Sequence, residues 1–271
     1  MKGNIEFVHN NDYRTAVILC GGKGTRLGNL SKKIPKALVR IQGQSILWYT
    51  INILKYYNFN HFILPVGYKG NLIKKFLKKN KNFQTNIDLI DTGIDTNIGK
   101  RILKVEKKIK SKNFLLLNGD AIFDFNLNKI FESHEKNKIG ITFLAGEIIY
   151  QYGTVGILNN KVIDFKRNIV YNAVKTKKSP NYTAYNYIGM SVIKSDFLKK
   201  YKKIYKNSEN FELSFFQKII KNFKSKIVKI DGMLNSVDNM KDIDYLNKKN
   251  LTDNRYNYIK GIKKKILKKF Y

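Results

Sequence analysis

The chain has 271 residues, 43% of them hydrophobic and 13% aromatic, which excludes a disordered protein and suffices for one large α/β domain or a domain with a small appendage. The formal net charge is +32. The lysines are spread along the whole chain and no zinc-finger, helix-turn-helix or RNP pattern accompanies them, so we expect no specific nucleic-acid partner.

The first half of the chain alternates apolar runs of strand length with segments of helix length, which predicts a mostly parallel sheet wound with helices. The expected strands are Thr15–Cys20, His61–Val66, Asn86–Ile90, Phe114–Leu117 and Ile139–Ala145, and the expected helices are Ser45–Tyr57 (with Ser45 as N-cap), Gly70–Lys79, Gly99–Lys110 and Leu127–Asn137. Because open parallel sheets bind ligands at the carboxyl ends of their strands, we expect the turn after the first strand, Asp91 and Asp120 to meet at one crevice.

From Gly153 the pattern changes to short extended runs, which predicts a mixed or antiparallel sheet. The expected elements are strands at Thr154–Leu158, Lys161–Phe165, Tyr185–Ile193 and Lys226–Ile230, and helices at Glu209–Asn222 and Met240–Lys249. The basic segment Tyr256–Tyr271 has isoleucines at helical spacing. We expect an amphipathic helix packed on the domain or on a second subunit, with attachment to an acidic membrane surface as the alternative.

The number of cysteines and the length of the apolar runs indicate the cellular compartment of the protein. Cys20 is the only cysteine, so an intramolecular disulfide and a thiolate metal cluster are both excluded. Its place before a glycine turn predicts a buried spacer rather than a nucleophile. No apolar run approaches the ~18 residues of a membrane-spanning helix, and residues 1–14 do not resemble a secretory signal. We expect a cytoplasmic protein.

A glycine-rich turn follows the first strand. Gly21, Gly22 and Gly24 let backbone amides approach an anion closely, because no Cβ blocks the approach and positive φ costs little. Arginine occurs at only six positions, so Arg26 beside this turn indicates the fork that phosphate oxygens favour. Lys36 follows directly after Pro35. The pattern favours a phosphate-binding turn, although the glycines alone fit an ordinary βα turn.

Neither of two better-known phosphate loops fits this turn. Walker A requires G-x-x-x-x-G-K-[ST], and the dinucleotide fingerprint fails because Leu27 stands where its third glycine is needed. The pattern L-x-G-G-x-G-T-R-L with a downstream P-K pair instead resembles the signature of sugar-1-phosphate nucleotidyltransferases. That resemblance implies a Rossmann-like α/β fold, a mostly parallel sheet flanked by helices, with a smaller mixed-sheet sugar-binding half. It also implies nucleotide contacts from Leu19, Cys20, Gly21, Gly22, Lys23, Gly24, Thr25, Arg26 and Lys36.

Carboxylates are needed to hold a metal ion beside the phosphates, and an apolar strand ends in Asn118-Gly119-Asp120. Mg²⁺ prefers oxygen ligands, often one or two carboxylates with substrate phosphates. The resemblance implies that Asp120 and Asp238 hold Mg²⁺ and that Gly119 borders the nucleotide; an Asx turn is the alternative for Asp120. Asp124 fits the family spacing G-D-x-x-x-D but could equally cap the helix near Leu127.

The segment Leu89–Arg101 resembles the D-T-G…T…G-x-R-L run of glucose-1-phosphate cytidylyltransferases, and Val66–Gly70 resembles their G-Y-K-G stretch. The resemblance implies that Thr96 and Arg101 contact the nucleotide. Ile98 and Lys100 depart from the family's threonine and glycine.

In the sugar half, the family's Glu-Lys-Pro motif is replaced by Lys166-Arg167-Asn168, so Lys166 or Arg167 is expected to hold the sugar phosphate. Asn186–Gly189 replaces an expected Asn-Gly-Gly stretch, which indicates a sugar pocket of different shape. The implied organisation is an N-terminal extension (1–14), a nucleotidyltransferase domain (15–250) with a nucleotide-binding half (15–150) and a sugar-binding half (151–250), and a basic C-terminal helix (251–271).

The expected function is nucleotidyl transfer from a nucleoside triphosphate, CTP first, to a sugar 1-phosphate, with Mg²⁺ as cofactor, giving an NDP-sugar for surface polysaccharide. A homo-oligomer is compatible with the sequence. The alternatives are the same fold with GTP, UTP or dTTP or with a non-glucose acceptor phosphate, a catalytically silent regulatory homologue that binds nucleotide sugars, and a basic nucleic-acid-binding protein.

Overall fold

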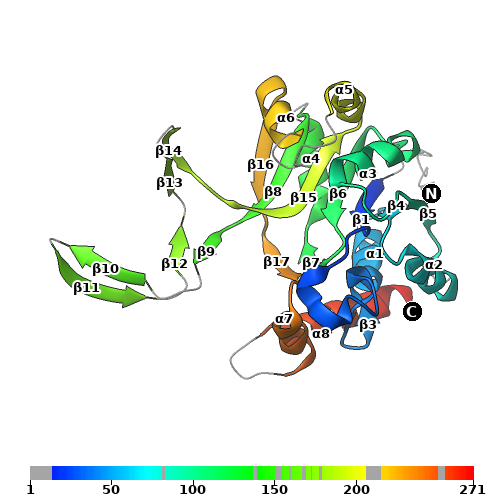
Figure 1. The fold of residues 1–271 in the computed structure, drawn as a ribbon, viewed down its shortest axis with the longest axis horizontal. Coiled ribbons are helices and arrows are strands. Elements are labelled where there is room, and N and C mark those ends of the chain that lie inside the picture. Colours follow the sequence, from blue (N-terminus) through cyan, green and yellow to red (C-terminus); the bar gives the residue numbers. More distant parts are fainter. Residues whose placement is uncertain are drawn as a thin grey trace, which may run out of the picture.

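The computed structural model describes residues 14–80, 83–136, 139–150, 154–158, 160–166, 169–171, 173–176, 179–205, 215–249 and 254–271. A seven-stranded sheet with strand order β16-β8-β15-β6-β1-β4-β5 runs through the molecule (Figure 1). Its strands are β1 (Thr15–Leu19), β4 (His61–Val66), β5 (Asn86–Asp91), β6 (Asn113–Asn118), β8 (Ile141–Gly146), β15 (Asn186–Lys194) and β16 (Ser225–Lys229). The pairs β6-β1, β1-β4, β4-β5 and β16-β8 are parallel, and only β15 runs antiparallel to its neighbours. The mostly parallel α/β sheet is therefore confirmed.

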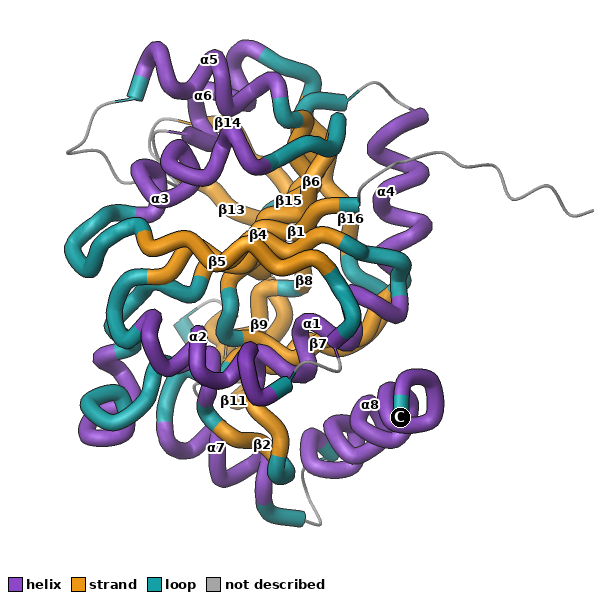
Figure 2. The backbone as a smooth tube through the Cα atoms, turned by 90° about the vertical axis from the view of Figure 1, so that its right-hand side faces the viewer, coloured by secondary structure: helices purple, strands orange, loops and turns teal. Residues whose placement is uncertain are grey.

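Helices cover both faces of this sheet, with α1 and α2 on one side and α3, α5 and α6 on the other (Figure 2). Alternate residues of β1 supply the two cores: Ala16 and Ile18 lie in one cluster and Val17 in the other. All six residues of β4 are buried, as expected for a parallel strand covered on both faces. The helices are α1 (Ile46–Tyr56), α2 (Gly70–Lys79), α3 (Ile98–Val105), α4 (Leu127–Lys136), α5 (Asp196–Ile204), α6 (Gln217–Asn222), α7 (Met240–Asn247) and α8 (Arg255–Phe270).

Most helix predictions agree with the structure. The Ser45 hydroxyl accepts a hydrogen bond from the Trp48 amide at 3.1 Å, which confirms the N-cap of α1. The third helix ends earlier than expected, at Val105, and a 3-10 turn over Glu106–Lys108 follows it. The predicted helix at Glu209–Asn222 is described only from residue 215, and α5 was not predicted.

Two short strands missing from the prediction shape the site. Strand β7 (Ala121–Phe125) pairs antiparallel with β17 (Gly232–Ser236), with Ala121 opposite Ser236. The Val237 amide then donates to the Asp120 carbonyl at 2.9 Å. This pairing brings the chain near Asp238 to the end of β6, more than a hundred residues earlier in the sequence.

The smaller sheet region consists of antiparallel pairs, as predicted. It contains β9 (Ile148–Tyr150), β10 (Thr154–Leu158), β11 (Lys161–Lys166), β12 (Ile169–Tyr171), β13 (Ala173–Thr176) and β14 (Ser179–Thr183), paired as β10-β11, β9-β12 and β13-β14. Figure 1 shows the β10-β11 hairpin extending away from the rest of the chain. Because β15 and β16 join the central sheet, the two expected halves share one sheet.

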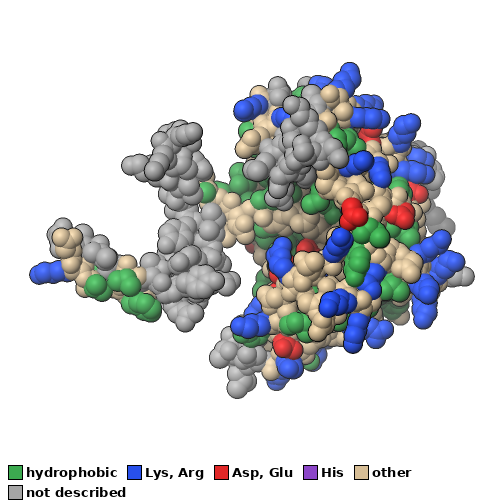
Figure 3. Space-filling view, viewed as in Figure 1, with side chains coloured by type: hydrophobic (Ala, Val, Ile, Leu, Met, Phe, Trp, Pro, Cys, Tyr) green, Lys and Arg blue, Asp and Glu red, His purple; other side chains and the backbone are tan. Residues whose placement is uncertain are grey.

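The C-terminal helix α8 packs on the domain through Ile259, Ile262 and Ile266, which confirms the first expectation for this segment. Lys265 donates to both carboxylate oxygens of Asp124, at 2.9 and 3.0 Å. Asp124 therefore anchors α8, and among the described contacts it is Asn126, not Asp124, that accepts from the Lys129 amide at the start of α4. Among the described helices, none is both long and apolar enough to cross a membrane. Figure 3 shows lysine and arginine side chains scattered over the visible face.

Candidate active site

The glycine turn, the loop after β5, the end of β6 and Asp238 line one cleft of about 590 Å³. Every predicted nucleotide or metal residue is among its lining residues: Leu19, Cys20, Gly21, Gly22, Lys23, Gly24, Thr25, Arg26, Lys36, Thr96, Arg101, Gly119, Asp120 and Asp238. Asp91 is the exception to the predicted convergence, since it lines a neighbouring cavity beside α2 and accepts from the Gly93 amide at 2.9 Å.

The floor of the cleft is a close approach between the ends of β1 and β6. The Gly119 amide donates to the Leu19 carbonyl at 3.2 Å, and a Cβ on Gly119 would lie 2.9 Å from both the Cys20 Sγ and that carbonyl oxygen. Burial raises the pKa of the Cys20 thiol to about 12, with a further contribution from the Asp120 charge. The thiol is therefore protonated at neutral pH, as expected of a spacer.

The residues of the glycine turn line the cleft. Gly24 has φ +63°, a backbone conformation that is strained for residues with a side chain. A Cβ atom on Gly24 would lie 3.4 Å from the Lys36 Cβ. In the described part of the chain, no hydrogen bond uses the amides of Gly22, Lys23 or Gly24. Leu27, just after the turn, is buried in the hydrophobic core, and its amide donates to the Gly24 carbonyl at 3.0 Å. These amides are available to an anion.

Arg101 is buried under the turn, only 4% exposed. Its guanidinium donates to the carbonyls of Gly21 (3.0 Å), Val66 (3.1 Å) and Ile94 (2.9 Å) and to the Thr92 hydroxyl (2.5 Å). Burial lowers the pKa of Arg101, and the charges of two nearby aspartates partly oppose this. Arg101 thus ties the glycine turn to the ends of β4 and β5.

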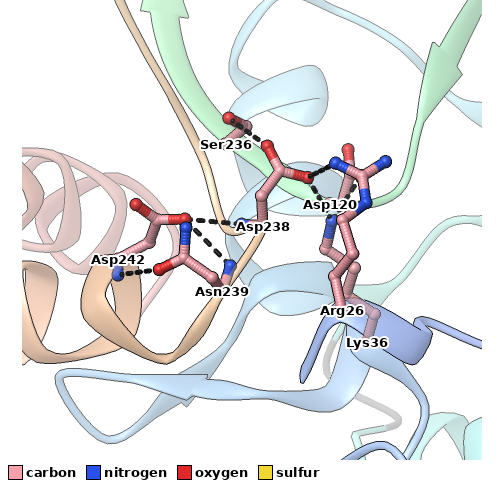
Figure 4. A network of polar contacts seen from close by, with 7 residues as sticks. All are labelled: Arg26, Lys36, Asp120, Ser236, Asp238, Asn239 and Asp242. Atoms are coloured by element: carbon pink, nitrogen blue, oxygen red, sulfur yellow. Dashed lines mark hydrogen bonds and ion pairs between the residues drawn. The ribbon is translucent and has the colours of Figure 1, made fainter. Parts of the chain in front are cut away.

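The charged residues meet in the same cleft, beside the glycine turn (Figure 4). Lys36 Nζ lies 2.8 Å from Asp120 Oδ2 and 3.0 Å from Asp238 Oδ1, and Arg26 lies 3.2 Å from the same Asp238 oxygen. Lys36 is held there because it begins a 3-10 turn directly after extended Pro35. Four residues from three distant parts of the sequence therefore form one charged cluster.

Asp238 is positioned by residues that the sequence analysis missed. Ser236 donates to Asp238 Oδ2 at 2.9 Å, and Asp242 Oδ2 accepts from the amides of Asp238 (2.8 Å) and Asn239 (3.0 Å). Asn239 and Asp242 form a capping box at the start of α7. Burial favours a higher pKa for Asp238, but hydrogen bonds from Lys36 and Ser236 outweigh it and the pKa lies below its usual range. The N-x-x-D spacing before α7 was the signal available in the sequence.

The donor set fits Mg²⁺. Asp120 and Asp238 each place a carboxylate oxygen against the same ammonium, so a cation can be shared between them. Within the described residues, no group of three or more acidic, histidine or cysteine side chains forms a metal cluster. Two carboxylates completed by substrate phosphates is an ordinary arrangement for this ion.

Lys166, one of the two residues expected at the sugar phosphate, is not among the described residues that line this cleft. Lys166 lies on β11, in the hairpin that extends away in Figure 1, and pairs with Asp164 at 2.8 Å. Arg167 lies outside the described residues. Gly189 of the altered Asn186–Gly189 stretch has φ +75°, and a Cβ there would lie 2.6 Å from the side-chain nitrogen Nδ2 of Asn118. This glycine leaves room for Asn118 at the cleft.

The family model described as nucleotidyl transferase matches residues 15–222, and the chain belongs to this family. It is 34% identical over 162 residues to a protein of Bacillus subtilis (strain 168) named as a probable glucose-1-phosphate cytidylyltransferase, covering 52% of this chain and 64% of that protein. It is 30% identical over 154 residues to the D-glycero-alpha-D-manno-heptose 1-phosphate guanylyltransferase of Aneurinibacillus thermoaerophilus, covering 56% and 66%. The chain thus spans slightly less than two thirds of either relative.

A solved structure has the same fold. The inositol-1-phosphate CTP transferase from T. maritima superposes with a TM-score of 0.65 at 16% identity, covering 95% of this chain and 98% of that one. The resemblance to sugar-1-phosphate nucleotidyltransferases is confirmed by the family match and the relatives.

Proposed function

We propose that this protein transfers a nucleotidyl group from a nucleoside triphosphate to a sugar 1-phosphate and releases pyrophosphate. The observation that carries the proposal is the meeting of Arg26, Lys36, Asp120 and Asp238 beside the glycine turn in one cleft. A triphosphate concentrates negative charge, and its binding requires fixed cations and amide donors that are already oriented. The cleft supplies both.

The chemistry requires positioning and charge neutralisation. A phosphate oxygen of the sugar 1-phosphate attacks the α-phosphorus, and the bond from that phosphorus to the oxygen that bridges the α- and β-phosphates breaks, so that this oxygen leaves as part of pyrophosphate. The attacking oxygen is already anionic, so no protein base or nucleophile is needed. The amides of the glycine turn bind phosphate oxygens, and Arg26 and Lys36 neutralise the charge on the triphosphate. Asp120 and Asp238 would hold Mg²⁺, which when bound neutralises phosphate charge and orients the α-phosphate.

CTP is the nucleotide we propose first, with GTP as the alternative. The Asp91–Arg101 segment and the relative named as a cytidylyltransferase support CTP, and the guanylyltransferase relative supports GTP. Lys166 or Arg167 remains the proposed contact for the sugar phosphate; for Lys166 to serve, it has to leave Asp164 and the hairpin has to approach the cleft. An NDP-sugar for surface polysaccharide, a cytoplasmic location and a homo-oligomer belong to the same proposal.

Pyrophosphate release tests the proposal directly. The four ribonucleoside triphosphates and dTTP, each with several sugar 1-phosphates and Mg²⁺, should give release with one preferred pair. Arg26→Ala and Asp120→Ala should abolish release with an unchanged circular dichroism spectrum, whereas Arg40→Ala, which removes an exposed arginine outside the cleft, should not. Binding of nucleotide sugars without any release by the unaltered protein would favour the silent homologue.

A further inference from the structure

The two carboxylates suited to a metal ion already share a cation of the protein itself. Lys36 Nζ contacts Asp120 at 2.8 Å and Asp238 at 3.0 Å, and its side chain is 16% exposed. Of the described basic residues that line the cleft, Lys36 alone contacts both carboxylates. Arg26 contacts only Asp238 and is 79% exposed, and Lys23 pairs with Asp95 at 3.0 Å.

This arrangement sets two positive charges in competition. A divalent cation that binds Asp120 and Asp238 needs the oxygens that the ammonium now contacts, and the two like charges repel each other strongly in a partly buried site. Lys36 must therefore leave at least one carboxylate when the metal binds. In the absence of another anion for Lys36, its departure leaves an unpaired ammonium in the cleft wall.

The glycine turn offers Lys36 an alternative position. The Lys36 Cβ lies 3.4 Å from the position of a Cβ on Gly24, so the stem of the side chain starts directly beneath the turn whose amides are available to phosphate. A four-carbon stem with a mobile ammonium can exchange a carboxylate for a phosphate by rotation alone. A triphosphate bound at the turn would compensate the ammonium that the carboxylates release.

We propose that Lys36 is an internal counter-ion of the metal ligands, which keeps the affinity for divalent cations low until a triphosphate draws the ammonium away from Asp120 and Asp238. The proposal rests on the proposed function, because it requires a triphosphate in this cleft. Metal ion and triphosphate then bind with positive coupling, and by linkage each strengthens the other by the same factor. Lys36 acts on metal binding through the carboxylates, in addition to its proposed contact with the nucleotide.

The test is binding of Mn²⁺ to the nucleotide-free protein, followed by electron paramagnetic resonance of the free ion. Mn²⁺ takes the same oxygen ligands as Mg²⁺. Lys36→Met and Lys36→Gln should each bind Mn²⁺ at least tenfold more tightly than the unaltered chain. Lys36→Arg, which keeps the charge, should bind as weakly as the unaltered chain. Lys32→Met is the matched control: it removes one positive charge from an exposed position in the same segment and should change the affinity less than twofold.

The outcomes separate local from overall charge. Equal or weaker Mn²⁺ binding by the folded Lys36→Met and Lys36→Gln proteins would overturn the proposal, and so would equal tightening by Lys32→Met, which would reflect only the large net charge. No nucleotide enters this titration. If the Mn²⁺ titration gives one of these contrary results while pyrophosphate release is normal, only the counter-ion role of Lys36 is refuted. If the unaltered protein releases no pyrophosphate, the proposed function itself is refuted.

Discussion

Arg101→Lys tests whether the glycine turn is held from beneath. Lysine keeps the positive charge but has one nitrogen, which cannot reach the four acceptors that the guanidinium binds on two sides. Two of the acceptors that Arg101 now binds also accept hydrogen bonds from other donors. The Val66 carbonyl also accepts from the Thr92 amide (2.9 Å) and hydroxyl (2.6 Å), and the Gly21 carbonyl also accepts from the Tyr68 amide (3.3 Å).

The expected loss follows from these shared acceptors. The Val66 and Gly21 carbonyls each keep another hydrogen-bond donor, so we count only two of the four charge-assisted bonds as lost. We therefore expect the free energy of unfolding to fall by about 3 kcal/mol. A domain stable by about 5–15 kcal/mol remains folded after such a loss. The freed turn should bind the triphosphate less well, and we expect the KM for the nucleotide to rise about tenfold, equivalent to about 1.4 kcal/mol.

Urea unfolding followed by circular dichroism, together with pyrophosphate-release kinetics, measures both effects. Lys100→Met is the matched control, because Lys100 is an exposed cation on the same helix whose side chain has no part in the Arg101 contacts. A raised KM with unchanged unfolding in Arg101→Lys would refute the tether and indicate direct contact between Arg101 and the nucleotide. The same rise in Lys100→Met would refute it as well.

Three further predictions use other parts of the site and core. Gly119→Ala should destabilise the protein by about 1–3 kcal/mol in urea unfolding, because its Cβ would meet Cys20 and Leu19 at 2.9 Å, whereas Gly22→Ala, with no atom within 4 Å of its Cβ, should be close to neutral. Asp242→Ala and Ser45→Ala should each cost about 1 kcal/mol as lost helix caps, but only Asp242→Ala should raise the Mg²⁺ concentration needed for half-maximal pyrophosphate release, because Asp242 also holds the backbone of Asp238. Burial, and secondarily the charge of Lys226, lowers the pKa of His134 to about 4, so the unfolded chain binds more protons than the folded one between about pH 6.5 and 4. Stability to urea should therefore fall by about 3 kcal/mol as the pH drops through that window, and a His134→Gln protein with the same slope would contradict this.

The sequence by itself identified the family and most of the nucleotide half. The glycine turn, Arg26, Lys36 and the strand ending at Asp120 are each specified within a short stretch, because strand, turn and helix starts depend on neighbouring residues. The alternation of apolar runs predicted the parallel sheet, and the spacing of isoleucines predicted that α8 packs with one face. In each case the relevant physical interaction is local or periodic along the chain.

Only the tertiary structure decided which side chains share a partner. The pairing of β7 with β17 brings Asp238 to Lys36. Asp124 binds Lys265 of α8, and Arg101 binds the Gly21 carbonyl beneath the glycine turn. The reason is that the contacts Asp238–Lys36, Asp124–Lys265 and Arg101–Gly21 join residues 202, 141 and 80 positions apart, and the existence of each depends on the sheet register and on which face each strand buries. Neither quantity can be read from the residues on one side of the contact.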